Sequence, residues 1–282
     1  MRVTYLGTAS VVLDYVSKDA ASKDGAASRL ITDPTFDPAG STYSMAPPWL
    51  PGTWFDSTKG YTTPVVPPEV GRFDAALISH DHHFDNFDVA GRALVVSDAV
   101  GTVITNPAAA RRLGRLRSGV VGLGVGGSTT VPSTTGGSGI HITGVPARHG
   151  PRFTPQVSEV TGFLLEAAGE PSVWITGDTV MTSALRAAAL REKGKVDVLV
   201  VHCGAVRFPR APLLGRALFT FTPAQVVELC ELLEPRVVIP VHRSGWTHFQ
   251  PESELRAVLD GSRFGDRVRW LEPGESTEIA ST

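Results

Sequence analysis

The stretch "SHDHHFDNFD", residues 79–88, holds three histidines and three aspartates and directly follows the apolar run "FDAALI". That run predicts a buried strand that delivers the cluster to the edge of a sheet. In an extended chain, side chains two residues apart point the same way at roughly 7 Å, so His80 and His82 can bind one ion while His83 faces the other side. Imidazole and carboxylate are ligands of zinc and similar metals, and Asp85 would add the oxygen donor. The stretch therefore predicts a metal site.

Four more side chains of the same kinds stand just past apolar, strand-like runs. His149 follows "IHITGVPAR", Asp178 follows "SVWITG", His202 follows "VDVLVV" and His242 follows "RVVIPV". Folds of the α/β class build active sites from polar side chains at the ends of strands that are far apart in sequence. We therefore expect these residues to join the first cluster at one edge of a sheet.

With these residues in place, the chain resembles the metallo-β-lactamase superfamily of metal-dependent hydrolases over nearly its whole length. "VTYLGTASVVLDY" followed by "LITDPTFD" is similar to the family's N-terminal hairpin, and "HDHHFDN" is similar to its His-rich loop. The resemblance implies a single α/β domain over residues 1–282, a four-layer αβ/βα sandwich with its metals at one edge of two facing sheets. It also implies that His149 is the isolated third His, Asp178 the metal-bridging carboxylate and His242 the last His. The segment "FTPAQVVELCELLEPRVVIPVH" is most similar to the branch of ascorbate-phosphate lactonases and N-acyl-phosphatidylethanolamine phospholipase D.

The His-rich loop departs from the family's usual H-x-H-x-D-H pattern, because it has one extra residue and ends in Asn86. In one register, which the Ser-His start favours, His80 and His82 bind one metal and Asp85 binds the other. In the second register the ligand positions are Asp81, His83, Asp85 and Asn86. In both, a neutral amide replaces an imidazole, which predicts a weaker second site or one that prefers manganese or iron. The candidate metal ligands are His80, His82, His83, Asp85, Asn86, His149, Asp178 and His242.

These donors predict metal-assisted hydrolysis, in which a hydroxide bound to one or two zinc ions attacks a phosphodiester, a lactone or an ester. Asp85 and Asp178 take part through the metals, and His202 and His248 are the candidate proton donors to the leaving group. Nuclease-type processing of nucleic acid and a non-catalytic metal-binding role are the alternatives. Composition argues against the nuclease, because a net charge of -2 gives no basic footprint for nucleic acid.

Two segments are candidates for shaping a substrate pocket. Residues 45–68 form a long Pro-rich stretch with four aromatic side chains, Trp49, Trp54, Phe55 and Tyr61. Such a stretch is typical either of a pocket wall or lid, or of packing on the protein's own surface.

The second segment is "VRFPRAPLLGRALF", which brings Arg207, Arg210 and Arg216 shortly after His202. These guanidinium groups either clamp a small or lipid-like anionic substrate or form a solvated basic loop.

Length and composition indicate a globular enzyme. A chain of 282 residues with 42% hydrophobic residues can bury a sizeable core. No apolar run reaches the roughly 18 residues that a membrane span needs, and the N-terminus lacks a signal-peptide pattern, so we expect a cytoplasmic protein. The two cysteines, Cys203 and Cys230, are too few for a disulfide framework, and Cys203 is expected to be a packed thiol rather than a site residue.

Overall fold

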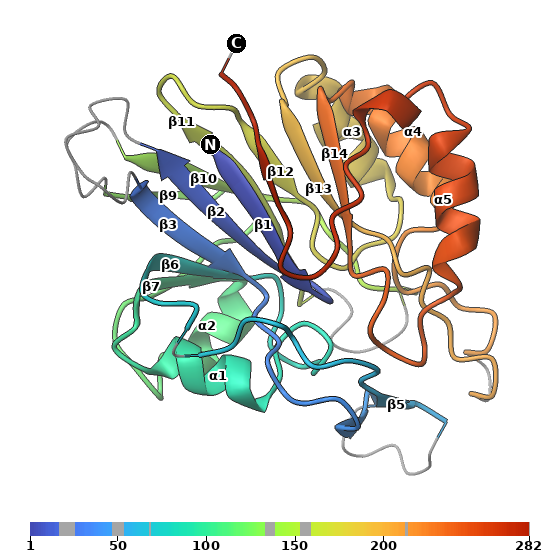
Figure 1. Cartoon of the computed structure of the whole chain (residues 1–282), viewed down its shortest axis with the longest axis horizontal. Helices are drawn as coiled ribbons and strands as arrows, with labels where there is room; N and C mark the ends of the chain where they lie inside the picture. Colours follow the sequence, from blue (N-terminus) through green and yellow to red (C-terminus); the bar gives the residue numbers. More distant parts are fainter. Residues whose placement is uncertain are drawn as a thin grey trace.

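The computed structural model describes residues 1–16, 26–46, 54–67, 69–132, 139–152, 159–211 and 214–281. In these residues two large sheets face each other (Figure 1). The seven-stranded sheet has the order β15 (Ser276–Glu278), β1 (Arg2–Gly7), β2 (Ser10–Val16), β3 (Ala26–Thr32), β6 (Phe73–Ile78), β7 (Val100–Thr105) and β8 (Val120–Gly122). The six-stranded sheet has the order β14 (Val237–Val241), β13 (Val198–His202), β12 (Val173–Ile175), β11 (Gly162–Ala167), β10 (Ile140–Val145) and β9 (Ser128–Val131). A small hairpin pairs β4 (Thr42–Ser44) with β5 (Asp56–Thr58).

Helices cover the outer face of each sheet (Figure 1). The seven-stranded sheet carries α1 (Val89–Val96) and α2 (Pro107–Leu113), and the six-stranded sheet carries α3 (Ser183–Arg191), α4 (Pro223–Leu233) and α5 (Glu252–Asp260). A short 3-10 turn, Gly265–Arg267, follows α5. The four-layer αβ/βα sandwich expected from the sequence is confirmed. No helix in the described ranges has the length and apolar character needed to cross a membrane.

The period of the strands explains why they read as unbroken apolar runs. In β6, Leu77 packs between the two sheets, whereas Ile78 packs under α1 and α2. In β13, Val200 packs between the sheets and Val201 packs under the helices of the other side. Because both faces of these strands are covered, both sets of alternating side chains must be apolar.

Local signals in the sequence set where the helices begin. The Asn106 side chain accepts hydrogen bonds from two backbone amides at the start of α2, and Pro107 is its first helical residue. Thr222 and Gln225 form a capping box around the start of α4. The strands on either side of α4, β13 and β14, pair in parallel, which confirms the expected βαβ unit.

The parallel pairings bring the carboxyl ends of several strands to one edge of the sandwich. In the seven-stranded sheet β3, β6 and β7 are parallel, and in the other sheet β12, β13 and β14 are parallel. The polar residues that follow or end these strands therefore meet at the same edge. They are Asp33 after β3, His80 after β6, Asp178 after β12, His202 at the end of β13 and His242 after β14.

Candidate metal centre

The His-rich loop begins where β6 ends. The chain leaves the strand at Ile78 and folds into turns, one of them closed by a hydrogen bond from the Phe87 amide to the His83 carbonyl at 3.0 Å. As a result His80, His82 and His83 each offer a ring nitrogen within 4.8 Å of the others. The expectation that His83 faces away from the first two was wrong, because it assumed that the extended strand continues through the loop.

Asp81 turns away from the three histidines. Its carboxylate accepts hydrogen bonds from Arg112 of α2, at 2.8 Å from Nε and 2.5 Å from Nη2, and the Arg92 guanidinium donates to its carbonyl oxygen. A carboxylate held by both arms of a guanidinium has little reason to leave it. The register that uses Asp81 as a ligand therefore does not fit the structure.

Five of the candidate ligands lie together and share Asp178. We call them the ring, and they are His80, Asp85, His149, Asp178 and His242. One group consists of His80, His149 and Asp178, and another consists of Asp85, Asp178 and His242, with the ligand atoms of each group within 4.8 Å of one another. Asp178 belongs to both groups and is fully buried. Two adjacent ions would thus share one carboxylate.

The backbone before Asp178 has room for glycine alone. Gly177 has a φ of +60°, and a Cβ built on it would lie 2.8 Å from the Thr161 carbonyl oxygen and 2.9 Å from the Ser79 Cβ. A larger residue would push β12 away from the His-rich loop, so the glycine allows the two halves of the ring to approach.

The imidazoles of His80 and His149 each form a hydrogen bond through one nitrogen, and their other nitrogen points towards the other ligands of the site. His80 Nδ1 lies 3.0 Å from the Ser79 hydroxyl, and His149 Nδ1 lies 2.7 Å from the Phe219 carbonyl oxygen. Their Nε2 atoms point inward, 3.2 Å and 2.9 Å from His83 Nδ1. Histidines that bind metals are commonly fixed in this way, by a hydrogen bond from the nitrogen that does not bind.

The charges of the site favour a bound cation. Asp33, Asp85 and Asp178 are buried together, and within the described ranges none of them pairs with a lysine or arginine. Burial, together with the carboxylates of Asp85 and Asp33, raises the pKa of Asp178 well above its usual range. Burial opposes ionisation of Asp85 too, but hydrogen bonds from His242 and His248 outweigh it and lower the pKa of Asp85 well below its usual range.

Three polar side-chain atoms of the ring residues also lack a hydrogen-bond partner among the described residues. They are Asp85 Oδ1, Asp178 Oδ2 and His242 Nδ1. Buried charges in proteins are paired or coordinate metals, and buried polar atoms are satisfied. Divalent cations fit both requirements, so these residues suit the metals that the sequence predicts.

Comparisons with known proteins show the family to which this chain belongs. The sequence model of the family described as "Beta-lactamase superfamily domain" matches residues 28–243. The chain belongs to the metallo-β-lactamase superfamily of metal-dependent hydrolases. It is 27% identical over 266 residues to a UPF0173 metal-dependent hydrolase of Anaeromyxobacter dehalogenans, an alignment that covers 89% of this chain and 83% of the relative.

Two solved structures share the fold of this protein. The isothiocyanate hydrolase from Delia radicum gut bacteria superposes with a TM-score of 0.76 at 18% identity and covers 100% of both chains. A possible metal-dependent hydrolase from Veillonella parvula superposes with a TM-score of 0.75 at 18% identity and covers 99% of both chains. Identities this low show the fold and no more.

The two candidate proton donors, His202 and His248, lie at different positions relative to the ring. His202 is fully buried beside the ring, with Nε2 3.4 Å from Asp33 Oδ2, and belongs to neither group around Asp178. His248 reaches the ring itself, with Nε2 3.0 Å from Asp85 Oδ2. The Asp33 carboxylate also accepts a hydrogen bond from the Ser79 amide at 2.7 Å. Sequence reasoning left Asp33 out of the site, although it follows a strand as the other site residues do.

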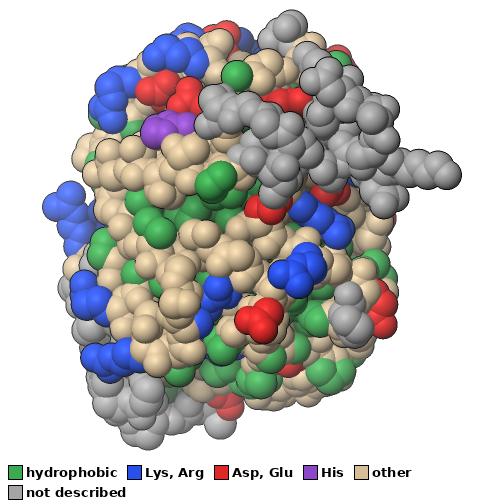
Figure 2. Space-filling model, turned by 90° about the vertical axis from the view of Figure 1, so that its left-hand side faces the viewer, with side chains coloured by type: hydrophobic (Ala, Val, Ile, Leu, Met, Phe, Trp, Pro, Cys, Tyr) green, Lys and Arg blue, Asp and Glu red, His purple; other side chains and the backbone are tan. Residues whose placement is uncertain are grey.

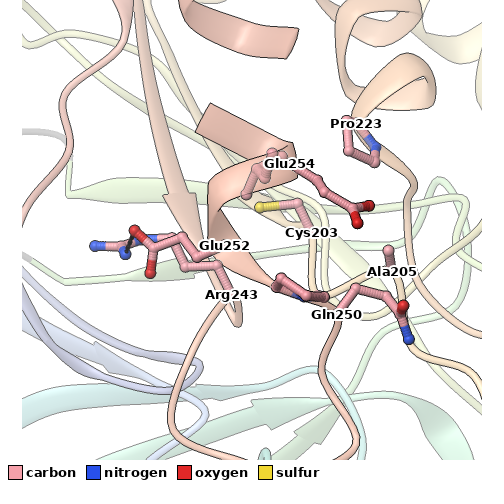
Figure 3. A pocket seen from close by; sticks show the side chains of 10 residues that line it. Cys203, Ala205, Pro223, Arg243, Gln250, Glu252 and Glu254 are labelled. Atoms are coloured by element: carbon pink, nitrogen blue, oxygen red, sulfur yellow. Dashed lines mark ion pairs between the residues drawn. The ribbon is translucent and has the colours of Figure 1, made fainter. Parts of the chain in front are cut away.

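The residues that come directly after His202 and His242 face the other side of the sheet. Figure 3 shows Cys203 and Arg243 lining a small cavity together with Glu252. Arg243 is buried and forms an ion pair with Glu252, which fixes the chain next to His242. Burial raises the pKa of the Cys203 thiol, whose Sγ lies 3.4 Å from the Val241 carbonyl oxygen. Cys203 is therefore a packed thiol on the helix-covered side of the sheet.

An apolar cluster lies next to the ring. We call its aromatic residues the aromatic wall, and they are Tyr43, Phe55, Phe84, Phe208, Phe219, Trp246 and Phe249. Phe208 stacks on His248 with ring centroids 5.4 Å apart, and Phe219 packs edge-on against His149 at 5.8 Å. Phe55, from the Pro-rich stretch, packs against Phe208 at 4.9 Å. Of the other aromatic residues in that stretch, Trp54 is exposed, Tyr61 accepts a hydrogen bond from the Thr8 amide, and Trp49 lies outside the described residues.

The arginines that follow β13 are not joined to the ring. Arg210 and Arg216 are exposed, and Arg207 is half-buried. Within the described ranges, none of the three forms a hydrogen bond or ion pair with a ring residue. The structure thus gives no support to an arginine clamp at the metals.

The buried imidazoles make the metal-free protein sensitive to acid. Burial lowers the pKa of His82 to about 3 and that of His242 to about 4, whereas histidines in an unfolded chain titrate near pH 6.5. Below that pH the unfolded chain binds more protons than the folded one, so stability falls as the pH drops from about 6.5 towards about 4. We expect the thermal unfolding midpoint of chelator-treated protein to fall over this range. A midpoint that stays constant between about pH 7 and about pH 5 would contradict the burial of these side chains.

Proposed function

We propose that this metal-dependent hydrolase acts on small, neutral substrates that join an apolar group to an electrophilic carbon, such as esters and lactones. The observation that carries the proposal is the aromatic wall, which touches the ring through Phe208 and Phe219. The wall is buried except for the half-buried rings of Tyr43, Phe84 and Phe249, which would contact an apolar group and offer nothing to a phosphate. This proposal replaces the anionic, lipid-like substrate that the arginines suggested in the sequence.

The residues of the ring divide the work of the reaction. A bound divalent ion would lower the pKa of a coordinated water and polarise the scissile bond. His80, His149 and Asp178 would hold one ion, and Asp85, Asp178 and His242 would hold the other. A donor set of imidazoles and carboxylates suits zinc and also accepts manganese or iron.

The remaining parts of the site bind the substrate and move the proton. The aromatic wall orients the apolar group and excludes water from the reacting carbon. We assign transfer of a proton to the leaving group to His202, whose Nε2 faces the Asp33 carboxylate at 3.4 Å.

Isothiocyanates belong to the same chemical class. The isothiocyanate hydrolase that shares this fold is named for a substrate with a neutral electrophilic carbon, and such a group attached to an aromatic ring would fit the same wall. We therefore include phenethyl isothiocyanate among the substrates to be tested.

The test is a comparison of three substrates with the metal-loaded protein. We expect kcat/KM for p-nitrophenyl acetate or phenethyl isothiocyanate to exceed that for bis-p-nitrophenyl phosphate by at least about 10-fold beyond the ratio of their uncatalysed rates, which corresponds to about 1.4 kcal/mol of additional transition-state stabilisation. Faster hydrolysis of the phosphodiester would overturn the proposed substrate class.

Substitution of Phe208 separates the wall from the arginines. We expect Phe208→Ala to raise KM for an aromatic ester about 10-fold, because the variant loses one aromatic contact of about 0.5–1.5 kcal/mol together with the apolar area that it buries. Arg210→Ala is the matched control, since this exposed residue lies two positions further along the same segment. Equal effects of the two substitutions would show that the wall does not contact the substrate.

Nucleic acid is a poor candidate substrate. The net charge of the chain is -2, and the face shown in Figure 2 has basic and acidic side chains interspersed. Binding to a phosphate backbone draws on a concentrated positive surface, which neither observation provides.

A further inference from the structure

The second metal group has an additional imidazole beside it. His248 is 8% exposed, and its Nε2 atom lies 3.0 Å from Asp85 Oδ2. His242 Nε2 lies 3.1 Å from the same oxygen. Two donors that bind one ion at about 2.1 Å lie about 3.0 Å apart at a right angle and about 3.4 Å apart at the tetrahedral angle. Each of the two nitrogen–oxygen distances thus matches the spacing of a pair of ligands around a single ion.

The outer nitrogen of His248 is held in the same manner as those of the other ring histidines. Its Nδ1 atom forms a hydrogen bond with the hydroxyl of Ser57, just as His80 bonds to Ser79 and His149 bonds to the Phe219 carbonyl. When the outer nitrogen donates this hydrogen bond, the lone pair of the inner nitrogen is free for a metal. His248 therefore has the arrangement of a ligand.

The backbone around His248 is fixed by β5. The Thr58 amide donates to the Thr247 hydroxyl at 3.1 Å, and the Thr247 amide donates to the Thr58 carbonyl at 3.2 Å. Phe208 stacks on the imidazole ring itself, with an angle of 16° between the planes. His248 is consequently a buried, oriented side chain and not part of a free surface loop.

Asn86 performs a different task from the histidine that it replaces. Its Nδ2 atom donates to Asp178 Oδ1 at 3.4 Å. An amide in this position orients the shared carboxylate, but the imidazole that the second metal loses at this position must come from elsewhere.

We propose that His248 is a ligand of the second metal ion, together with Asp85, Asp178 and His242, and supplies the imidazole that is missing at position 86. Ser57 is the positioning residue that fixes the tautomer of His248. This assignment rests on the metal dependence of the proposed function and not on the substrate class, so metal content tests it without reference to activity.

The experiment measures metal content in wild type, in His248→Ala, His248→Gln and Ser57→Ala, and in one control variant. Each is freed of metal, titrated with zinc and dialysed, and the retained zinc is measured by elemental analysis. The matched control is His141→Ala, because His141 is an exposed histidine on β10. Circular dichroism confirms that each variant is folded.

We expect wild type and the His141 variant to retain two equivalents of zinc and both His248 variants to retain one. Ser57→Ala should keep the His248 ligand but lower the affinity for the second ion by about 10–100-fold. The glutamine variant is decisive, because it can still donate a hydrogen bond to Asp85 but offers no imidazole. Two equivalents in His248→Gln would show that His248 only supports Asp85, and two equivalents in His248→Ala would overturn the proposal outright.

A second measurement needs no stable His248 variant. In cobalt-substituted wild-type protein, each ligating imidazole with a protonated outer nitrogen gives one strongly shifted, exchangeable proton resonance. We expect Ser57→Ala to broaden or shift one such resonance, since a metal on Nε2 leaves the proton on Nδ1, which would then donate to the Ser57 hydroxyl. An unchanged set of resonances in this variant would refute the assignment even if turnover were altered. Loss of all metal in wild type would instead refute the metal dependence on which the proposed function rests.

Discussion

Asp178→Ala is expected to lower kcat/KM by about 1,000-fold or more, since about 4 kcal/mol of metal-based stabilisation corresponds to that factor. The reason is its double membership, because its carboxylate belongs to the group with His80 and His149 and also to the group with Asp85 and His242. Removing any other single ligand disturbs one ion, whereas this substitution disturbs both. The measurement is kcat/KM on the best substrate of the panel, with retained zinc determined on the same samples.

The fold should survive this substitution. Asp178 is a buried acid whose pKa is raised by burial and by neighbouring carboxylates, so removing it relieves the metal-free protein of an unfavourable group. We expect the chelator-treated variant to unfold at the same temperature as chelator-treated wild type or above it. Asp98→Ala, at an exposed aspartate, serves as the control. Wild-type activity with metal still bound in Asp178→Ala would contradict the role of the shared carboxylate.

Lys59→Met should produce the largest loss of stability, about 3 kcal/mol. The side chains of Lys59 and Asp88 are both 0% exposed and form an ion pair at 3.4 Å, and the lysine also donates to the Thr35 carbonyl at 3.1 Å. Removal of one partner leaves the other charge buried without compensation. Two backbone amides, of Asp37 and Gly91, continue to hold Asp88 and keep the cost at the lower end of the usual range.

The loss is measured by thermal unfolding with metal removed, and at about 2–4 °C per kcal/mol it amounts to about 6–12 °C. Lys195→Met is the control, since the ion pair of Lys195 with Glu192 is exposed and worth little. Because Lys59 is next to β5, which carries Ser57, the variant should also hold its second metal ion more weakly. Equal midpoints for the two lysine variants would show that the buried pair does not anchor β5.

The sequence predicted the ring wherever a ligand stands at the end of a strand. His80, His149, Asp178 and His242 follow apolar runs. Parallel pairing brings the strand ends before His80, Asp178 and His242 together whatever their separation along the chain, whereas His149 follows β10, which pairs antiparallel with its neighbours. The side of the ring taken by His83 could not be predicted, because the alternation of an extended strand stops at Ile78.

The contacts of residues outside the strands could not be predicted from the sequence, for a different reason. Ser57 and His248 are 191 positions apart, and their contact depends on how β5 is laid against the segment after β14. Lys59 lies in "DSTKGY", which has neither a periodic pattern nor a motif that would indicate a buried cation. Contacts of this kind follow from tertiary packing, which one sequence without its relatives does not encode in any local pattern.

The ring joins the two halves of the sandwich in a way that bears on how the protein opens. His80 and Asp85 belong to the loop after β6 of the seven-stranded sheet, whereas His149, Asp178 and His242 follow strands of the six-stranded sheet. Ions bound by ligands from both sheets would connect the two sheets. A ligand that binds only the folded state adds its binding free energy to stability. The loaded protein should then exchange its slowest amide protons from both sheets at one common rate. After chelation this contribution is lost, so the opening free energy of both sheets should fall, although the core that they share remains.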